Sequence, residues 1–159
     1  MTIIPSQSTE TTETTEPTEK ALFEAIFRNQ RTVAVVGLSP QPDRASYGVA
    51  AALQKYGWRI VPINPNAAQI LGEVCYPSLA DAALQVNGIA LVNVFRRSAE
   101  VLPIAQAAIA IGAKGLWLQQ GVRHDEAAAL ARAAGLLVVQ DRCLKVEYRQ
   151  WLSTQPDST

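Results

Sequence analysis

The sequence predicts an α/β protein built on one doubly wound, five-stranded parallel sheet with helices on both faces. Apolar runs rich in Val, Ile and Leu recur along the chain, and segments of helical length separate them. The runs are hydrophobic almost without interruption, as strands are when helices cover both faces of a parallel sheet. Gly57, Gly112 and Gly135 each stand between a helical stretch and the next apolar run, where helices commonly end in a left-handed residue.

Five strands follow from these runs. They are predicted at Thr32 to Val36, Trp58 to Ile63, Ile89 to Val94, Gly115 to Leu118 and Leu136 to Val139. Because crossovers between parallel strands are right-handed, the simplest strand order is 3-2-1-4-5. Ligands bind beyond the carboxyl ends of the strands in such a sheet, so the segments after strands one to four form the expected site.

The remaining segments predict helices and a tail. A short amphipathic helix begins at Ala21 and ends between Arg28 and Gln30. Further helices are predicted at Tyr47 to Tyr56, Ser78 to Leu84, about Ala99 to Ile111, Asp125 to Ala134 and Leu144 to Trp151. Residues 1 to 19 contain seven Thr and four Glu with almost nothing apolar after Ile4. We therefore expect a disordered tail over residues 1–18 and a single domain over residues 19–159.

Composition limits the possible partners. No apolar run approaches the roughly 18 to 20 residues of a membrane span. Residues 20 to 159 carry 14 basic and 10 acidic side chains, and the pair Arg96–Arg97 is too small a cluster for a nucleic-acid platform. We expect a small anionic ligand, with no nucleic acid and no membrane as partner. Cys75 and Cys143 have no metal or disulfide spacing and the N-terminus has no secretory pattern, which favours a cytoplasmic location.

The segment after strand one begins Gly37-Leu38-Ser39 and leads through Arg44 into the helix that contains Tyr47. Ser39 stands where the dinucleotide fingerprint GxGxxG has its second glycine, so this segment is not that fingerprint. The N–H groups of the helix start and the guanidinium of Arg44 predict an anion site of the kind a phosphate occupies. The alternative is a helix-capping loop with a solvated arginine.

Strand two is followed by Asn64-Pro65-Asn66, which offers amides where an NAD-binding chain normally has an acidic residue. The amides suit a ribose or a purine edge, and the alternative is a simple Asn-Pro turn. NAD is therefore disfavoured as the ligand.

The next two strand ends add further polar groups. Strand three ends in Val94-Phe95-Arg96-Arg97, where an aromatic ring and guanidinium groups suit adenine and phosphate. Such an arginine pair is otherwise a solvated surface feature. Strand four leads to Gln119, which offers a donor and an acceptor, and to Gly121, which permits close backbone approach.

Enzymatic motifs are absent from the sequence. It contains no GxSxG nucleophile elbow, no Walker lysine motif and no His-rich metal set. His124 is the single histidine, and its position before a helix is more typical of a cap. We predict no catalytic residue and no metal ligand.

Taken together, these segments resemble the small single-domain CoA-binding proteins, a Rossmann-like family related to the nucleotide-binding domain of the succinyl-CoA synthetase alpha subunit. The matching stretches cover about residues 31 to 150 and read VAVVGLSPQPDRASYGVAAALQKYGWRIVPINPN, ILGEVCYPSLAD, LVNVFRRSAEV, IGAKGLWLQQGV and VVQDRCLKVEYR. The resemblance implies a site for coenzyme A or an acyl-CoA across the carboxyl edge of the sheet. The residues expected to line it are Gly37, Leu38, Ser39, Arg44, Tyr47, Asn64, Pro65, Val94, Phe95, Arg96, Gln119 and Gly121.

The resemblance implies a binding module without chemistry of its own, acting as a carrier, sensor or regulatory module. The synthetase joins its CoA domain to a second domain with a phosphorylated histidine and to an ATP-grasp subunit, and 159 residues have room for neither. The main alternative is an NADP- or nucleotide-dependent oxidoreductase with an atypical fingerprint. A third hypothesis is a regulatory protein whose acidic tail recruits a partner, and a fourth is a mixed disulfide between CoA and Cys143. A homodimer or an unidentified protein partner is a further alternative.

Overall fold

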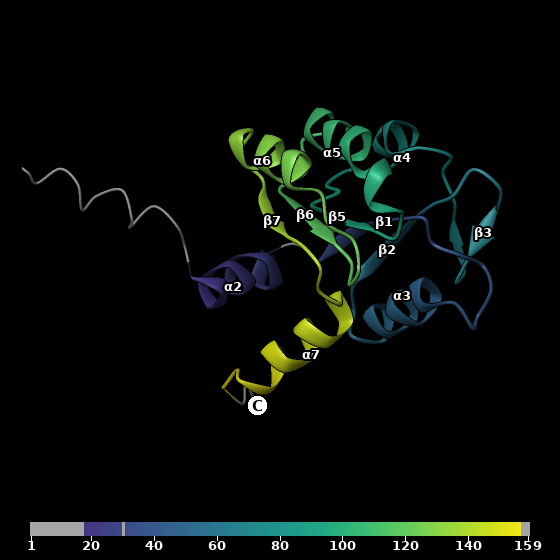
Figure 1. The fold of residues 1–159 in the computed structure, drawn as a ribbon. Helices are drawn as coiled ribbons and strands as arrows, with labels where there is room; N and C mark the ends of the chain where they lie inside the picture. The colour runs from purple at the N-terminus through teal and green to yellow at the C-terminus, as the bar shows by residue number, and fades with distance from the viewer. Residues whose placement is uncertain (1–17, 30, 157–159) are drawn as a thin grey trace, which may run out of the picture.

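The computed structural model describes residues 18–29 and 31–156. Five parallel strands form a central sheet: β1 (Thr32–Val36), β2 (Arg59–Ile63), β5 (Leu91–Val94), β6 (Gly115–Leu118) and β7 (Leu137–Val139) (Figure 1). The strand order is β2-β1-β5-β6-β7, and every pairing in the sheet is parallel. The predicted doubly wound α/β class is confirmed.

Helices cover both faces of this sheet (Figure 1). One layer holds α4 (Leu79–Gln85), α5 (Val101–Ala110) and α6 (Asp125–Ala133), and a 3₁₀ turn at Ser98–Glu100 leads into α5. The other layer holds α2 (Glu19–Asn29), α3 (Ala45–Lys55) and α7 (Leu144–Ser153). No helix in the described part of the chain is long and apolar enough to cross a membrane.

The alternation of side chains along each strand divides the core in two. In β1, Ala34 and Val36 pack with α4, α5 and α6, whereas Val33 and Val35 pack with α2, α3 and α7. Both layers are apolar at the sheet, which explains why the strands are hydrophobic almost without a break.

The predicted strand order 3-2-1-4-5 is wrong, because the third strand of this sheet along the chain, β5, pairs with β1 on the side opposite β2. Pro62 supplies the physical reason. A proline has no N–H for a ladder, so within sheets it is confined to edge strands or bulges. The Pro62 carbonyl accepts a hydrogen bond from Tyr76 N at 3.0 Å on the outer side of β2, so the missing donor faces the side on which no strand of the sheet follows.

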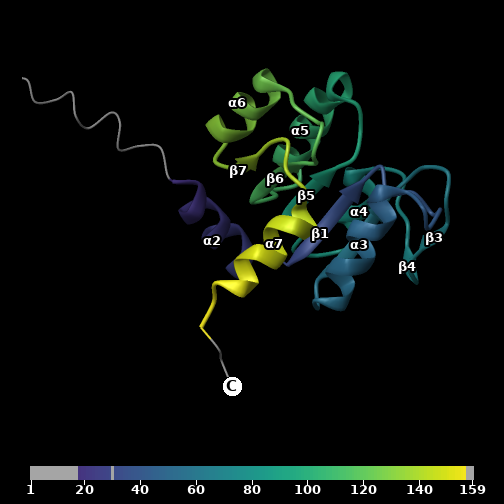
Figure 2. The same cartoon turned by 60° about the horizontal axis from the view of Figure 1, so that its bottom comes forward.

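The outer side of β2 is followed by a small hairpin that the sequence did not predict. It consists of β3 (Gln69–Ile70) and β4 (Glu73–Val74), two strands too short to show a periodicity. Its turn residues Leu71 and Gly72 have φ angles of 56° and 79°, as a type I′ turn requires. The hairpin lies beside α3 (Figure 2), whose Gln54 Nε2 donates to the Leu71 carbonyl at 3.1 Å.

The first helix packs firmly on the body. Ile26 and Phe27 of α2 are fully buried, and the Phe27 ring lies 5.7 Å from that of Trp117 and 5.2 Å from that of Tyr148. Of the predicted tail, residues 1–17 lie outside the described residues. Thr18 is described, and its hydroxyl accepts from Ala21 N at 3.0 Å at the start of α2.

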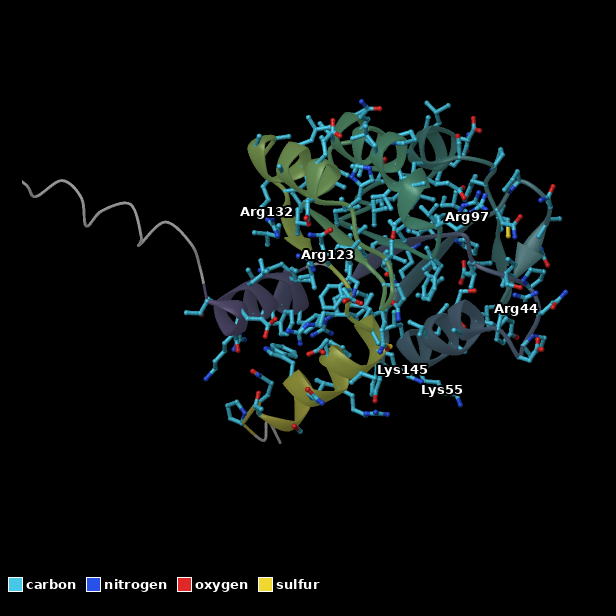
Figure 3. The ribbon with its side chains drawn as sticks, in the orientation of Figure 1. Arg44, Lys55, Arg97, Arg123, Arg132 and Lys145 are labelled. Atoms are coloured by element: carbon cyan, nitrogen blue, oxygen red, sulfur yellow. The ribbon has the colours of Figure 1, made fainter. Side chains whose placement is uncertain are left out.

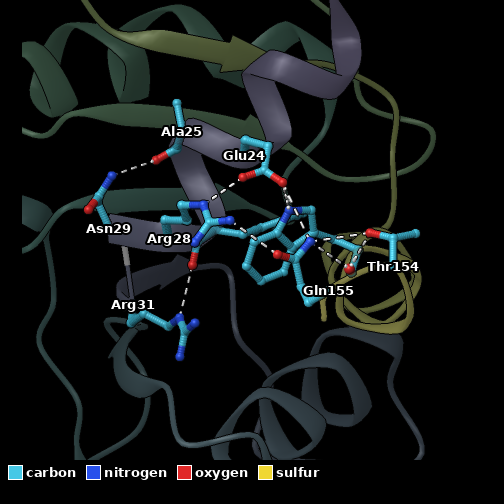
Figure 4. Close-up of polar contacts among 9 residues, drawn as sticks. Glu24, Ala25, Arg28, Asn29, Arg31, Thr154 and Gln155 are labelled. Atoms are coloured by element: carbon cyan, nitrogen blue, oxygen red, sulfur yellow. Dashed lines mark hydrogen bonds and ion pairs between the residues drawn. The ribbon is translucent and has the colours of Figure 1, made fainter. Parts of the chain in front are cut away.

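A polar network joins α2 to the end of the chain (Figure 4). Trp151 Nε1 donates to Glu24 Oε2 at 3.0 Å, and Arg28 Nη2 donates to Gln155 Oε1 at 3.2 Å. Gln155 Nε2 also donates to Glu24 Oε2 at 3.4 Å. The first and last described segments are therefore held side by side on one face of the sheet.

Candidate functional site

A cavity of about 700 Å³ lies at the carboxyl edge of the sheet, beyond β1, β2 and β5. The chain leaves β1 toward α3 in one layer and leaves β5 toward α5 in the other, so the edge opens between these two strands. The lining comes from the segments after the three strands and from α4 and α5: Val36, Gly37, Ser39, Pro40, Ile63, Asn64, Pro65, Asn66, Pro77, Ser78, Leu79, Arg96, Ala99, Glu100, Pro103, Ile104 and Ala107.

Gly37 allows the ends of β1 and β5 to approach each other closely. Phe95 N donates to the Val36 carbonyl at 2.8 Å, and Gly37 has φ +86°. A Cβ atom on Gly37 would lie 2.4 Å from the Phe95 carbonyl oxygen. Only glycine satisfies both the backbone conformation and this contact.

Ser39 continues the same segment along the cavity. Its N–H donates to Ser46 Oγ at 3.0 Å, and its own Oγ accepts from Gln41 N at 3.1 Å. A hydroxyl has one donor and two acceptor positions, so this hydrogen bond leaves the Ser39 hydroxyl hydrogen available for a ligand oxygen.

Asn64 joins the segment after β2 to the segment after β1. Its Nδ2 donates to the Leu38 carbonyl at 2.9 Å, and its Oδ1 accepts from Asn66 N at 2.7 Å. Both ends of the amide are thereby used within the protein. Asn64 fixes the shape of this wall, while Pro65 and Asn66 are exposed on it.

The segment after β5 brings a cation and an anion to the cavity. Arg96 Nε donates to Glu100 Oε1 at 3.0 Å, and Arg97 Nε donates to Glu100 Oε2 at 2.9 Å. Hydrogen bonds from Arg96 and then Arg97 lower the pKa of Glu100, so this carboxyl is ionised at neutral pH. Two guanidinium groups and one carboxylate leave this segment with one net positive charge.

The opposite wall is apolar and comes from α4 and α5. Leu79, Pro103, Ile104 and Ala107 line it. Pro103 falls in the first turn of α5, because the helix proper begins at Val101 after the 3₁₀ turn, and a proline there leaves no helical acceptor unpaired. Sequence reasoning missed this wall, and Pro103 was the one local signal that the helix begins later than Ala99.

Five predicted residues meet at the cavity: Gly37, Ser39, Asn64, Pro65 and Arg96. They come from three separate segments. The others lie elsewhere among the described residues. Leu38 is fully buried in the layer of α2, α3 and α7, and Phe95 is partly buried in the same layer. Val94 is fully buried in the opposite layer.

Arg44 and Tyr47 begin α3 but do not line the cavity. Arg44 is the exposed N-cap residue, and its side chain makes no capping hydrogen bond. Tyr47 is partly buried and packs against the core on the face of the sheet that α2, α3 and α7 cover. Figure 3 shows Arg44 and Arg97 toward the end of the molecule that holds the hairpin, with Arg123 and Arg132 on the α6 side.

Gln119 and Gly121 lie farther along the edge, after β6. Gln119 is buried, and its Oε1 accepts from Leu144 N at the start of α7 at 3.4 Å. Gly121 N donates to Asp141 Oδ1 at 2.7 Å. His124, as expected, caps α6, with its Nδ1 accepting from Ala127 N at 3.1 Å. In the described ranges no three His, Cys, Asp or Glu side chains are grouped to hold a metal ion.

Comparison with known proteins identifies the family. A model of the CoA binding domain matches residues 31–149. The chain belongs to this family. The match leaves out α2 and the last turn of α7, the two segments joined by the Glu24–Trp151 hydrogen bond.

The chain is also similar to individual proteins in sequence and in structure. YneT of Bacillus subtilis is 37% identical over 130 residues, which cover 81% of this chain and 93% of that protein. A hypothetical protein of Pyrococcus horikoshii has a solved structure with a TM-score of 0.78 and 31% identity, covering 85% of this chain and 93% of that one. An ADP-forming acetate–CoA ligase of Archaeoglobus fulgidus is 36% identical over 59 residues, only 9% of its length.

Proposed function

We propose that this protein binds coenzyme A or an acyl-CoA in the cavity beyond β1, β2 and β5, as a carrier, sensor or regulatory module without chemistry of its own. The observation that carries the proposal is the convergence of Gly37, Asn64 and Arg96 at one cavity in a chain of the CoA-binding family. These residues come from three strand ends that are far apart in the sequence.

The residues of the cavity suit such a ligand. CoA combines an anionic diphosphate and 3′-phosphate with an adenine ring and a flexible, weakly polar arm. Arg96 and the Ser39 hydroxyl offer donors for phosphate oxygens. The wall formed by Ile104 and Ala107 offers apolar surface for the ring or the arm. The volume of about 700 Å³ falls within the roughly 300–1,000 Å³ of ordinary small-molecule sites.

The remaining predicted site residues enter as part of this proposal. Arg44 and Tyr47 at the start of α3 follow the Ser39 segment along the chain, and we expect them to contact a ligand that extends out of the cavity. The backbone of Leu38 and Phe95 borders the close contact between Gly37 and the end of β5. Gln119 and Gly121 follow β6, the next strand of the sheet.

A thermal-shift titration with CoA, acetyl-CoA, dephospho-CoA, NADP and ATP tests the proposal. A ligand at about 100 times its dissociation constant adds about 2.7 kcal/mol to the free energy of unfolding. We expect CoA to raise the melting temperature, dephospho-CoA to raise it less, and NADP to leave it unchanged. Stabilisation by NADP with no response to CoA would replace the proposal with the oxidoreductase alternative.

The position of the ligand is tested by Arg96→Gln. A hydrogen bond to a charged group contributes about 1.5 kcal/mol or more, so this variant is expected to bind CoA about tenfold more weakly. Arg149→Gln is the matched control, because Arg149 is exposed on α7 in the other layer. Equal affinities in the two variants would place the ligand elsewhere.

A further inference from the structure

The carboxylate of Glu100 is divided between two arginines. Its Oε1 accepts from Arg96 Nε at 3.0 Å and also pairs with Arg96 Nη2. Its Oε2 accepts from Arg97 Nε at 2.9 Å. A guanidinium usually binds a carboxylate with two parallel bonds, one to each oxygen. Here Arg97 holds the second oxygen, so Arg96 reaches only one.

The two arginines differ in position. Arg96 and Glu100 line the cavity, whereas Arg97 does not. The Arg97 side chain is 88% exposed, against 45% for Arg96 and 29% for Glu100. Arg97 therefore binds Glu100 from the solvent side, and Arg96 binds it from the cavity side.

An anionic group that binds Arg96 competes with the Glu100 carboxylate for the charge of one guanidinium, whose Nε and Nη2 already pair with Glu100. The free energy of that competition depends on how strongly Glu100 is attached to Arg96. If both carboxylate oxygens were available, Arg96 could donate two parallel hydrogen bonds to Glu100, one to each oxygen, in place of its two contacts at Oε1, and its charge would be neutralised more completely.

We propose that Arg97 is a positioning residue of the site: by holding Oε2 of Glu100, it keeps Arg96 available for a phosphate-type group of the ligand. The Glu100 carboxylate competes with the ligand for Arg96 and thereby limits the affinity of the cavity for anionic groups. The inference rests on the proposed function for the identity of the ligand. Arg97, which does not line the cavity, thereby controls how strongly Arg96, which does line it, binds an anionic ligand.

The proposal predicts two opposite effects and a dependence between them. Arg97→Gln frees Oε2 to pair with Arg96, so CoA binding weakens. Glu100→Gln removes the competitor, so CoA binding tightens. In a chain that already carries Glu100→Gln, Arg97 has no carboxylate to hold, and Arg97→Gln has no further effect.

Isothermal titration of CoA into the folded single and double variants at about 0.15 M salt measures this cycle. Exposed ion pairs contribute little in water, so we expect Arg97→Gln to weaken binding only about two- to fivefold, with a similar gain for Glu100→Gln. The double variant is expected to match Glu100→Gln alone. Arg123→Gln is the control, because it removes an equal exposed charge that pairs with Asp125 at 3.3 Å and not with Glu100. Its CoA affinity should equal that of the wild type.

Two outcomes would overturn the proposal. If Arg97→Gln weakens binding by the same factor with and without Glu100, the Arg97 charge acts directly and not through the carboxylate. If Glu100→Gln weakens binding, Glu100 supports the ligand instead of competing with it. Melting temperatures of all variants show whether each one is folded.

Failure of the proposed function gives a different result. If the wild type does not bind CoA at all, the same cycle is measured with inorganic pyrophosphate, following the Arg96 Nε–Hε resonance by NMR. A pyrophosphate-dependent shift that Arg97→Gln weakens and Glu100→Gln strengthens would retain the competition while discarding CoA. No shift of the Arg96 resonance with either probe would overturn the inference as well.

Discussion

At the scale of single residues, Gly37 matters because it lies where two strands of the sheet converge beside the cavity. Its position combines φ +86° with a carbonyl oxygen 2.4 Å from where a Cβ would be. The clash is with backbone, which cannot turn aside as a side chain would. The same residue therefore supports both the sheet edge and one wall of the site.

Gly37→Ala is expected to lower the free energy of unfolding by at least about 2 kcal/mol, because left-handed strain and the Phe95 contact add together. Gly48 supplies the control, since it lies inside α3 and an added Cβ would meet nothing within 4 Å. Gly48→Ala should raise stability by about 0.5–1 kcal/mol. Urea denaturation measures both, and equal effects of the two substitutions would contradict the role given to Gly37.

The site was predictable only in part at this scale. Gly37, Ser39, Asn64, Pro65 and Arg96 follow their strands directly, so the carboxyl-end rule found them. Glu100 was missed because a glutamate at a helix start has an ordinary explanation in the helix dipole. The wall from α4 and α5 was missed because the side of the sheet on which the cavity opens depends on how these helices pack on the sheet, which no local pattern encodes.

The burial of the Asn93 side chain has no explanation in the structure. Its side chain is fully buried in β5, and neither amide atom has a hydrogen-bond partner in the described structure. An unpaired buried polar group costs about 1–3 kcal/mol. The observed packing against neighbouring strands does not account for this cost.

At the scale of elements, the packing of α2 against α7 depends on charge as well as aromatic contact. Hydrogen bonds from Arg28 and then Trp151 lower the pKa of Glu24 below its ordinary value of 4.5. A carboxyl whose pKa is lower in the folded state contributes stability above its unfolded pKa and loses it as pH falls through the folded pKa.

Glu24→Gln should therefore melt below the wild type at pH 7, with a gap that closes as the pH falls below 4.5 and Glu24 of the wild type is protonated. Asp43→Asn is the control, because Asp43 is exposed in the loop before α3 and no hydrogen bond or ion pair of its carboxylate is present among the described residues. Melting curves between pH 3 and pH 7 decide the question. A gap that is constant over this range would show that the Glu24 charge is not involved.

The elements themselves were largely predictable, because long apolar runs and helix-length segments are strong local patterns. Two features were not. The order of the strands was wrong because Pro62 was read as part of an apolar run, although its missing N–H was a sign of an edge strand. The hairpin of β3 and β4 has only two residues in each strand, and its turn contains Leu71 at a position where glycine or asparagine is usual.

At the scale of the whole molecule, the sheet separates two layers with different features. The cavity draws its helical lining from α4 and α5, whereas the aromatic cluster of α2 and α7 lies on the other face. Changes to α2 should therefore affect stability more than ligand affinity.

Two truncations test this division. Removal of residues 1–17 is expected to leave both the melting temperature and CoA affinity unchanged, which also tests the proposed tail and domain boundary. Removal of residues 1–30 exposes the partners of Ile26 and Phe27, and we expect a loss of at least about 3 kcal/mol of unfolding free energy. Loss of CoA binding on removal of residues 1–17 would instead show that this acidic segment is part of the site.

The hydrogen bond between Arg28 and Gln155 joins positions 127 residues apart. A ribosome adds about 5–20 residues each second, so roughly 6 to 25 seconds separate the synthesis of Arg28 in α2 from that of its partner Gln155. During that interval Phe27 has neither Tyr148 nor Trp151 to cover it. A newly synthesised chain therefore exposes the apolar side of its first helix to chaperones and to aggregation until its last helix has left the exit tunnel.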